Sequence, residues 1–261
     1  MQLNDDRTAT RGSLTNETLA LYSNAHKWLL IPIIVIVVAF TPLYFATFTS
    51  EPWAYHTHAL SAIAWYVLII TQPYLATRGR LRDHRKWGMA GLLIAGAFIA
   101  SAISITPTNV YFGHIGGFPP VFPAEFFYGL VFTETLAMLG FTVSVSMAII
   151  KSKVPDEHAT WMLGTVFFGF MPAWLRLSMF PAFAFDIEMS TTSALMISIP
   201  IFVAVIFYVG FRIGKLTHPM ILASAGVTVL MISTSYIGGL EWYQEFVTNL
   251  MKPMVPWPEA N

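Results

Sequence analysis

This chain of 261 residues contains no cysteine, and charged residues make up only 11% of it. The absence of cysteine excludes disulfide bonds and thiolate metal sites. The scarcity of charge excludes an ordinary soluble domain, in which about a quarter of residues are charged. Net charge is zero at pH 7, so nothing in the composition indicates a nucleic-acid partner. Phosphate loops and nucleophile elbows are also missing, which argues against familiar hydrolase or kinase chemistry but leaves open whether the chain is an enzyme.

Long apolar runs fill the chain instead, and hydrophobic residues make up 56% of it. A helix needs about 20 apolar residues to cross roughly 30 Å of hydrocarbon. Seven runs meet this length, at residues 28–48, 58–76, 87–105, 124–150, 159–182, 192–211 and 219–237. The sequence therefore predicts an all-α fold, an integral membrane bundle of seven transmembrane helices in the lipid bilayer. It comprises a polar tail (1–25), the membrane domain (26–240) and a C-terminal segment (241–261).

The basic residues predict the orientation of this bundle. All but two of the 14 Lys and Arg residues fall on one face: Arg7, Arg11, Lys27, Arg78, Arg80, Arg82, Arg85, Lys86, Lys151, Lys153, Arg212 and Lys215. Lys252 lies on the other face and Arg176 within a span. Because cytoplasmic loops carry the excess of Lys and Arg, we expect the N-terminus in the cytoplasm and the C-terminus outside.

One connector on the outer face is unusually long and rich in Gly, Pro and aromatic residues. It covers residues 107–123, PTNVYFGHIGGFPPVFP. Connectors of this length are usually functional or disordered, and the aromatic content argues against disorder. We expect it to fold over the outer mouth of the bundle.

A short internal repeat places histidines at the cytoplasmic face. Asp83-His84-x-x-Trp87 aligns with Glu157-His158-x-x-Trp161 at an offset of 74 positions. His26 and His218 precede two other spans in the same way. Two interpretations stay open: interfacial side chains with a structural task, or haem or metal ligands whose tautomer the adjacent carboxylate fixes. His84 and His158 are the candidate cofactor-binding residues.

Two ionisable residues fall inside predicted spans, where such residues are usually functional. Glu134 lies roughly 15 Å and Arg176 roughly 9 Å from the outer ends of their helices, at 1.5 Å per residue. An antiparallel hairpin with its turn near Pro155 places these two at similar depth on neighbouring helices. We therefore expect a Glu134–Arg176 contact, direct or through water, with Glu125 nearby at the start of the fourth span.

A metal site is a further hypothesis for the outer half. His56 and His58 could offer two imidazoles to copper or zinc if the stretch is extended, since alternate side chains then share a face. His114 is the candidate third ligand. If His58 is already helical, the two side chains diverge and the site fails.

Two blocks of residues carry a family resemblance. The first is His58-x6-Trp65, Gln72-Pro73 and His84-Arg85-x-x-Gly88; the second is His158-x-x-Trp161-Met162 and Pro172-Ala173-x-x-Arg176. In this order they resemble an uncharacterised family of bacterial multi-helix membrane proteins. The resemblance implies a multi-pass protein of the bacterial inner membrane. No established activity comes with it. It points to His58, His84, His158 and Arg176.

Three functions remain as hypotheses. The first is a redox-associated protein that binds haem, copper or zinc through its histidines. The second is a transporter or binding protein for a small molecule or proton, which uses Glu134 and Arg176. The third is an accessory subunit of a larger membrane complex. A retinal protein is excluded, because its Schiff base needs a lysine in the seventh span and residues 219–237 have none.

Overall fold

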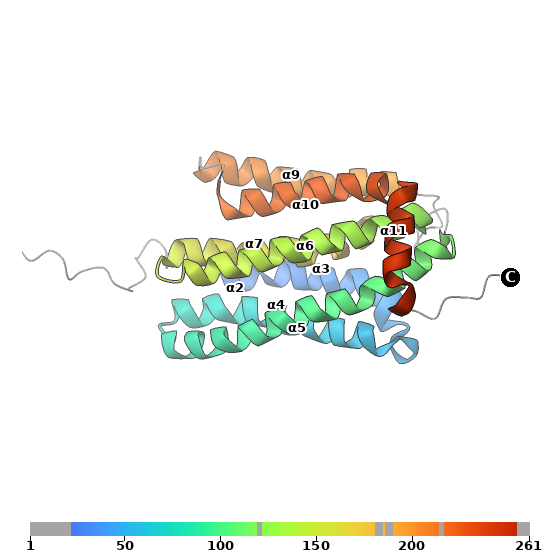
Figure 1. Ribbon diagram of the computed structural model, residues 1–261. Helices are drawn as coiled ribbons and strands as arrows, with labels where there is room; N and C mark the ends of the chain where they lie inside the picture. The colour runs from blue at the N-terminus through green and yellow to red at the C-terminus, as the bar shows by residue number, and fades with distance from the viewer. Residues whose placement is uncertain (1–21, 119–121, 181–184, 186–189, 214–216, 255–261) are drawn as a thin grey trace, which may run out of the picture.

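The computed structural model describes residues 22–118, 122–180, 185, 190–213 and 217–254, and these residues are helical almost throughout (Figure 1). The all-α prediction is confirmed. The helices are α2 (Ala25–Trp28), α3 (Leu30–Phe40), α4 (Trp53–Thr77), α5 (Leu81–His114), α6 (Ala124–Ile150), α7 (Pro155–Ser178), α9 (Thr191–Ile213), α10 (Pro219–Gly238) and α11 (Glu241–Met251). Two-residue strands, β1 (Gly117–Phe118) and β2 (Phe122–Pro123), pair antiparallel between α5 and α6.

Most helices match the predicted spans, and the fourth has the predicted bounds. Helix α5 is the clearest departure, because its 34 residues continue through Pro107 to His114. The first half of the connector predicted at 107–123 is therefore helix. A proline inside a helix removes one backbone hydrogen bond, and helices packed among other helices in a membrane protein tolerate that loss.

The first predicted span is not one continuous helix. Helix α3 passes at Thr41 into a π-helical turn (Thr41–Phe45), and a 3-10 turn (Phe48–Ser50) follows. Pro42 lacks the N–H that an α-helix would need there, so the backbone widens at this point. The Thr41 hydroxyl donates to the Val37 carbonyl at 2.7 Å. The chain then turns into α4, which begins after Pro52.

Five of the helices in the described ranges are long and apolar enough to cross a membrane: α4, α5, α6, residues Ser193–Phe211 of α9, and α10. Many of their large apolar side chains are exposed, including Leu93 and Phe207. Such surfaces are costly in water and favourable in lipid. The structure is thus compatible with a multi-pass membrane protein.

Helix α7 is less apolar because it lies inside the bundle, packed against α3, α4, α6, α9 and α10. A central helix meets other helices rather than lipid, so it can carry Arg176 and small residues. It packs with α6, α9 and α10 around one apolar core, which contains Phe126, Met171, Phe202 and Met231. A second core, around Trp65 and Phe141, joins α4, α5, α6 and α7.

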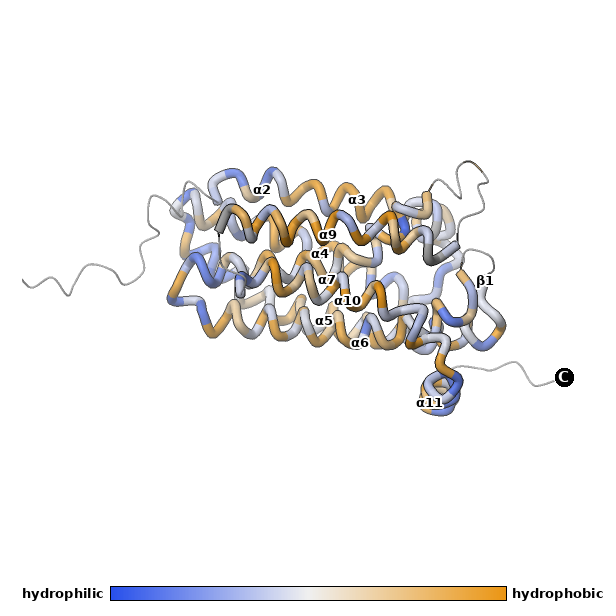
Figure 2. Tube along the Cα trace, turned by 90° about the horizontal axis from the view of Figure 1, so that it is seen from above, coloured by the Kyte–Doolittle hydropathy of each residue, from blue (hydrophilic) through white to orange (hydrophobic). Residues whose placement is uncertain are grey.

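The two ends of the bundle differ in character. Hydrophilic residues gather at both ends of the tube in Figure 2, and hydrophobic ones lie between them. The short turns after α4 and α6 lie at the same end as α2; these turns and the start of α5 carry the basic residues from Arg78 to Lys86, with Lys151 and Lys153. Helix α11 lies across the opposite end, roughly perpendicular to the bundle, and buries Tyr243 and Val247 there.

Some expectations concern residues outside the described ranges. Arg7 and Arg11 lie there, as do Lys215 and most of the predicted tail. The orientation predicted from charge therefore rests on the sequence.

Candidate functional site

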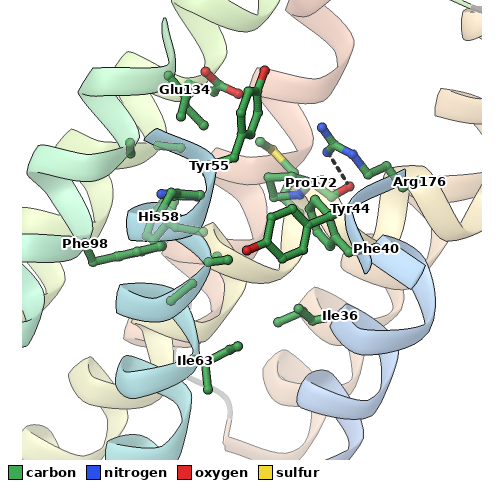
Figure 3. Close-up of a pocket in the computed structure, with 18 of the residues that line it drawn as sticks. Ile36, Phe40, Tyr44, Tyr55, His58, Ile63, Phe98, Glu134, Pro172 and Arg176 are labelled. Atoms are coloured by element: carbon green, nitrogen blue, oxygen red, sulfur yellow. Dashed lines mark hydrogen bonds between the residues drawn. The ribbon is translucent and has the colours of Figure 1, made fainter. Parts of the chain in front are cut away.

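A cavity of about 600 Å³ lies between helices α3, α4, α5, α6 and α7. This volume is within the range of small-molecule binding sites. Its inner part is lined by apolar side chains, which include Ile33, Ile36, Ile63, Phe141 and Phe168. Polar side chains gather at the other part: Tyr44, Glu51, Tyr55, His58, Thr108, Glu134 and Arg176. Figure 3 shows this division, with Ile36 and Ile63 at one end and Glu134, Tyr55 and Arg176 at the other.

Glu134 projects from α6 into the polar end of the cavity. Its Oε2 accepts a hydrogen bond of 2.8 Å from Nδ2 of Asn109 on α5. Asn109 is buried, and it lies in the part of α5 that the sequence assigned to a connector. A carboxylate inside an apolar bundle needs such a donor, because an unsatisfied charge there is costly.

Arg176 reaches the same end of the cavity from α7. Its Nη1 donates to the Pro172 carbonyl one turn earlier, at 3.1 Å, as the dashed line in Figure 3 marks. Its guanidinium carbon lies 4.8 Å from the centre of the Phe40 ring on α3. Proline lacks a backbone N–H but keeps its carbonyl, so Pro172 can accept this hydrogen bond. The cation is therefore held by an aromatic face and by one carbonyl.

Glu134 and Arg176 line one cavity but do not form a direct ion pair. Among the described residues, the ion pairs within 4.0 Å are Arg80–Asp83 and Lys151–Glu157, both at the basic end. A second, much smaller space of about 10 Å³ is also lined by Glu134 and Arg176, together with Thr133 and Thr234. This is roughly the room that one water molecule needs. Glu134 and Arg176 thus line the same two spaces without a direct ion pair.

His58 belongs to the cavity, whereas His56 and His114 do not line it. Both His56 and His58 lie in the first two turns of α4, so their side chains point about 200° apart around the helix. His56 Nδ1 is 2.8 Å from the Tyr44 hydroxyl, and His58 Nδ1 is 3.2 Å from Ser101 Oγ. His114 is the last residue of α5.

The copper or zinc site expected from His56, His58 and His114 is accordingly not assembled. Within the described ranges, no three His, Asp or Glu side chains come together closely enough to hold a metal ion. The extended backbone that this site required is replaced by helix, because α4 begins at Trp53 rather than near His58.

Glu125 also lies apart from the cavity, in the first turn of α6. An acidic side chain is favourable at a helix N-terminus, which gives Glu125 a local role. It packs where α6 and α10 cross, since its carbonyl stands beside Gly238.

His84 and His158 come together at the basic end of the bundle, with ring centres 6.0 Å apart. Each also closes its own helical hairpin. His84 Nδ1 lies 3.3 Å from the Gln72 carbonyl, and His158 Nδ1 lies 2.8 Å from the Ala148 carbonyl. A carbonyl only accepts, so Nδ1 of His158 is the N–H donor.

The two hairpins of the short sequence repeat therefore use their histidines in the same way, to tie the start of one helix to the end of the preceding helix. This arrangement gives both side chains a structural task. A role for them in binding haem or metal rests on the sequence alone. His218 has another local task, since its ring accepts from the Met220 N–H at the start of α10.

Sequence reasoning missed three aromatic residues of the site, Phe40, Tyr44 and Tyr55. They stand in or beside the irregular segment between α3 and α4, where periodicity carries no information. A signal was present for Tyr44 and Tyr55, because both lie close to His56 and His58 in the sequence.

Comparison of the chain with known protein families, with curated proteins and with solved structures gives no match.

Proposed function

We propose that this chain is a multi-pass membrane protein that binds a small molecule in the cavity enclosed by helices α3, α4, α5, α6 and α7. The observation that carries the proposal is the cavity itself, about 600 Å³ in volume, with Glu134, Arg176 and His58 at one end and apolar side chains at the other. A concave, mostly apolar space with a few convergent polar groups is the usual form of a ligand site. Ionisable residues kept inside a membrane bundle support the same function.

The proposal includes seven spans with the N-terminus in the cytoplasm, in a bacterial inner membrane. Helices α3 and α7 would supply the two spans beyond the five that are apolar enough by composition. In support, α7 is surrounded by other helices, and α3 packs along α7 in the same layer of the bundle. The gathering of described Lys and Arg at one end favours the orientation.

Small-molecule binding is proposed because the described residues bring polar groups together around one space. The transport of a small molecule would need a second conformation, so binding is the function that the cavity supports.

The test is to identify what co-purifies with the protein. The full chain is extracted from its native membrane, and the bound compounds are measured by mass spectrometry of a solvent extract. Wild type is compared with Ala62→Trp, which fills the cavity from α4, and with Val67→Trp, a control on the exposed face of the same helix.

We expect one compound at near one per chain in wild type and Val67→Trp, and at least a tenfold loss in Ala62→Trp. In Glu134→Gln and Arg176→Gln we expect a ten- to hundredfold weaker affinity, because a charged hydrogen bond contributes about 1.5–3 kcal/mol. Equal extracts from wild type and Ala62→Trp would show that the cavity holds no ligand and would overturn the proposal.

A further inference from the structure

The cavity opens toward the lipid-facing surface between α3 and α4. Helix α3 packs mainly along α7 and contacts α4 only sparingly. Three large side chains that line the cavity are also partly exposed: Val37 at 44%, Phe45 at 40% and Ile63 at 39%. In Figure 3, Ile36 and Ile63 face each other from these two helices below the polar groups. An opening with apolar walls in the middle of a span communicates with lipid rather than water.

The polar end of the cavity carries charges of both signs. Arg176 would repel a cation there, and Glu134 and Glu51 would repel an anion. A charged head group would also lose its hydration on entry, which is costly without a matched partner. A neutral head group is the chemistry that this end favours.

Hydrogen-bond donors are nevertheless available for that head group. A guanidinium carries five N–H donors, and the described residues accept one hydrogen bond from Arg176, at the Pro172 carbonyl. Ser101 Oγ donates to the Phe98 carbonyl, so the His58 ring donates to Ser101 through Nδ1, and its Nε2 is left on the cavity side as an acceptor. The hydroxyls of Tyr44 and Tyr55 belong to the same part of the lining, but each already has a partner, His56 Nδ1 for Tyr44 and Thr108 for Tyr55, so the free donors are those of Arg176. A head group with carbonyl or ether oxygens suits these donors.

Aromatic side chains form the walls at this end. The His58 ring is stacked on Phe98, with centres 5.3 Å apart and planes 16° apart. Phe40, Tyr44 and Tyr55 line the space opposite and above them, as Figure 3 shows. Flat rings pack well between such walls, in offset or edge-to-face contact.

We propose that the ligand is a neutral, membrane-borne amphiphile with a flat, hydrogen-bond-accepting ring and an apolar tail, the chemistry of a prenylquinone, and that it enters between α3 and α4. Its ring lies beside Arg176, His58 and Glu134, and its tail runs past Ile36 and Ile63 into lipid. This inference rests on the proposed function and adds the class of ligand and its route. It concerns binding and includes no electron-transfer step.

The test uses the full chain in lipid nanodiscs and follows binding by quenching of tryptophan fluorescence. The probes are a prenylquinone with a fully substituted ring, a fatty acid of similar tail length, and the quinone ring without its tail. We expect the prenylquinone to bind at least tenfold more tightly than either of the other two. Arg176→Gln and His58→Phe should each weaken its binding tenfold or more.

The route is tested with two exposed positions on α4. Ile63→Trp narrows the opening, whereas Leu60→Trp changes an exposed side chain that does not line the cavity. We expect association of the prenylquinone to slow at least fivefold in Ile63→Trp and to stay unchanged in Leu60→Trp. Equal rates in both variants would overturn lateral entry.

The outcomes separate the two proposals. If the fatty acid binds best, or if no probe binds while a co-purified compound still depends on Ala62, the ligand class is wrong and the binding function stands. If no probe binds and the cavity-filled variant retains the same extract as wild type, both proposals fail.

Discussion

At the scale of single residues, several polar side chains within the bundle have defined partners. Glu134 accepts from Asn109, and Trp65 Nε1 donates to Thr165 Oγ1 at 3.3 Å in a fully buried contact. Arg176 combines an aromatic face with a backbone carbonyl. Buried polar groups without partners would each cost about 1–3 kcal/mol, which explains why so few polar residues are tolerated and why those present are placed with care.

One residue-scale prediction concerns Tyr22, which precedes α2 outside the spans. Its hydroxyl donates to Asp156 Oδ1 at 3.1 Å, and burial together with this carboxylate raises the pKa of Tyr22 above its ordinary value of 10. Because the folded pKa is higher than the unfolded one, the contribution to stability is complete below pH 10 and is lost as pH rises above 10.

We therefore expect the unfolding temperature of wild type to fall more steeply between pH 10 and pH 11 than that of Tyr22→Phe. Thermal unfolding of both proteins in the same detergent measures the difference. Parallel curves would contradict a role for the Tyr22–Asp156 contact in tying the N-terminal segment to α7.

At the scale of helices, small residues decide how closely neighbours approach. Helices α6 and α10 cross at Gly129 and Gly238, where an added Cβ would meet the backbone of Thr234 and of Glu125, respectively. The hydroxyls of Thr133 and Thr234 bond at 2.8 Å along the same contact. Close backbone approach through small residues is a usual means of helix association in membranes.

Alanine at either glycine should consequently push the two helices apart. We expect Gly129→Ala and Gly238→Ala to destabilise the protein by about 1–3 kcal/mol, the usual cost of overpacking. Gly226→Ala on α10 is the matched control, because a Cβ there meets nothing within 4 Å. Removing a glycine from a helix interior favours the helix by roughly 0.5–1 kcal/mol, so this variant should be neutral or slightly more stable. Thermal unfolding in detergent ranks the three; equal effects would contradict the close crossing.

Helix α11 shows a different division of faces. Tyr243 and Val247 are buried against the end of the bundle, while Trp242, Phe246 and Leu250 form an exposed apolar stripe at spacings of four. Residues four positions apart lie on the same face of a helix. Helix α11 lies across the end opposite the basic turns, and exposed aromatic side chains at the end of a bundle favour the membrane interface.

At the scale of the whole molecule, the distribution of charge and the number of crossings must agree. The described chain begins at the basic end with α2 and ends at the opposite end with α11. An odd number of crossings satisfies this arrangement, and seven is the number that we propose.

The absence of cysteine allows a direct test of this topology. Lys153→Cys lies in the basic turn between α6 and α7, and Thr49→Cys lies before α4 at the other end. We expect a membrane-impermeant maleimide to label Thr49→Cys in intact cells with the outer membrane opened, and Lys153→Cys only after the inner membrane is permeabilised. Labelling in the reverse order would contradict the orientation.

The amino-acid sequence by itself determined the helical class, the approximate helix bounds, the two different ends and the identity of Glu134 and Arg176 as ionisable residues within helices. These properties depend on hydropathy and charge along the chain, which are local. A short sequence repeat also indicated that His84 and His158 occupy equivalent places in two similar helical hairpins. Which side chains meet was decided only by the tertiary structure, because the direction in which a helical residue points depends on how each helix is rotated against its neighbours. Asn109 reaches Glu134 only since α5 continues past Pro107, and Arg176 meets Phe40 only since α3 packs on α7. The cavity is a property of five helices together, and no segment of the chain encodes it alone.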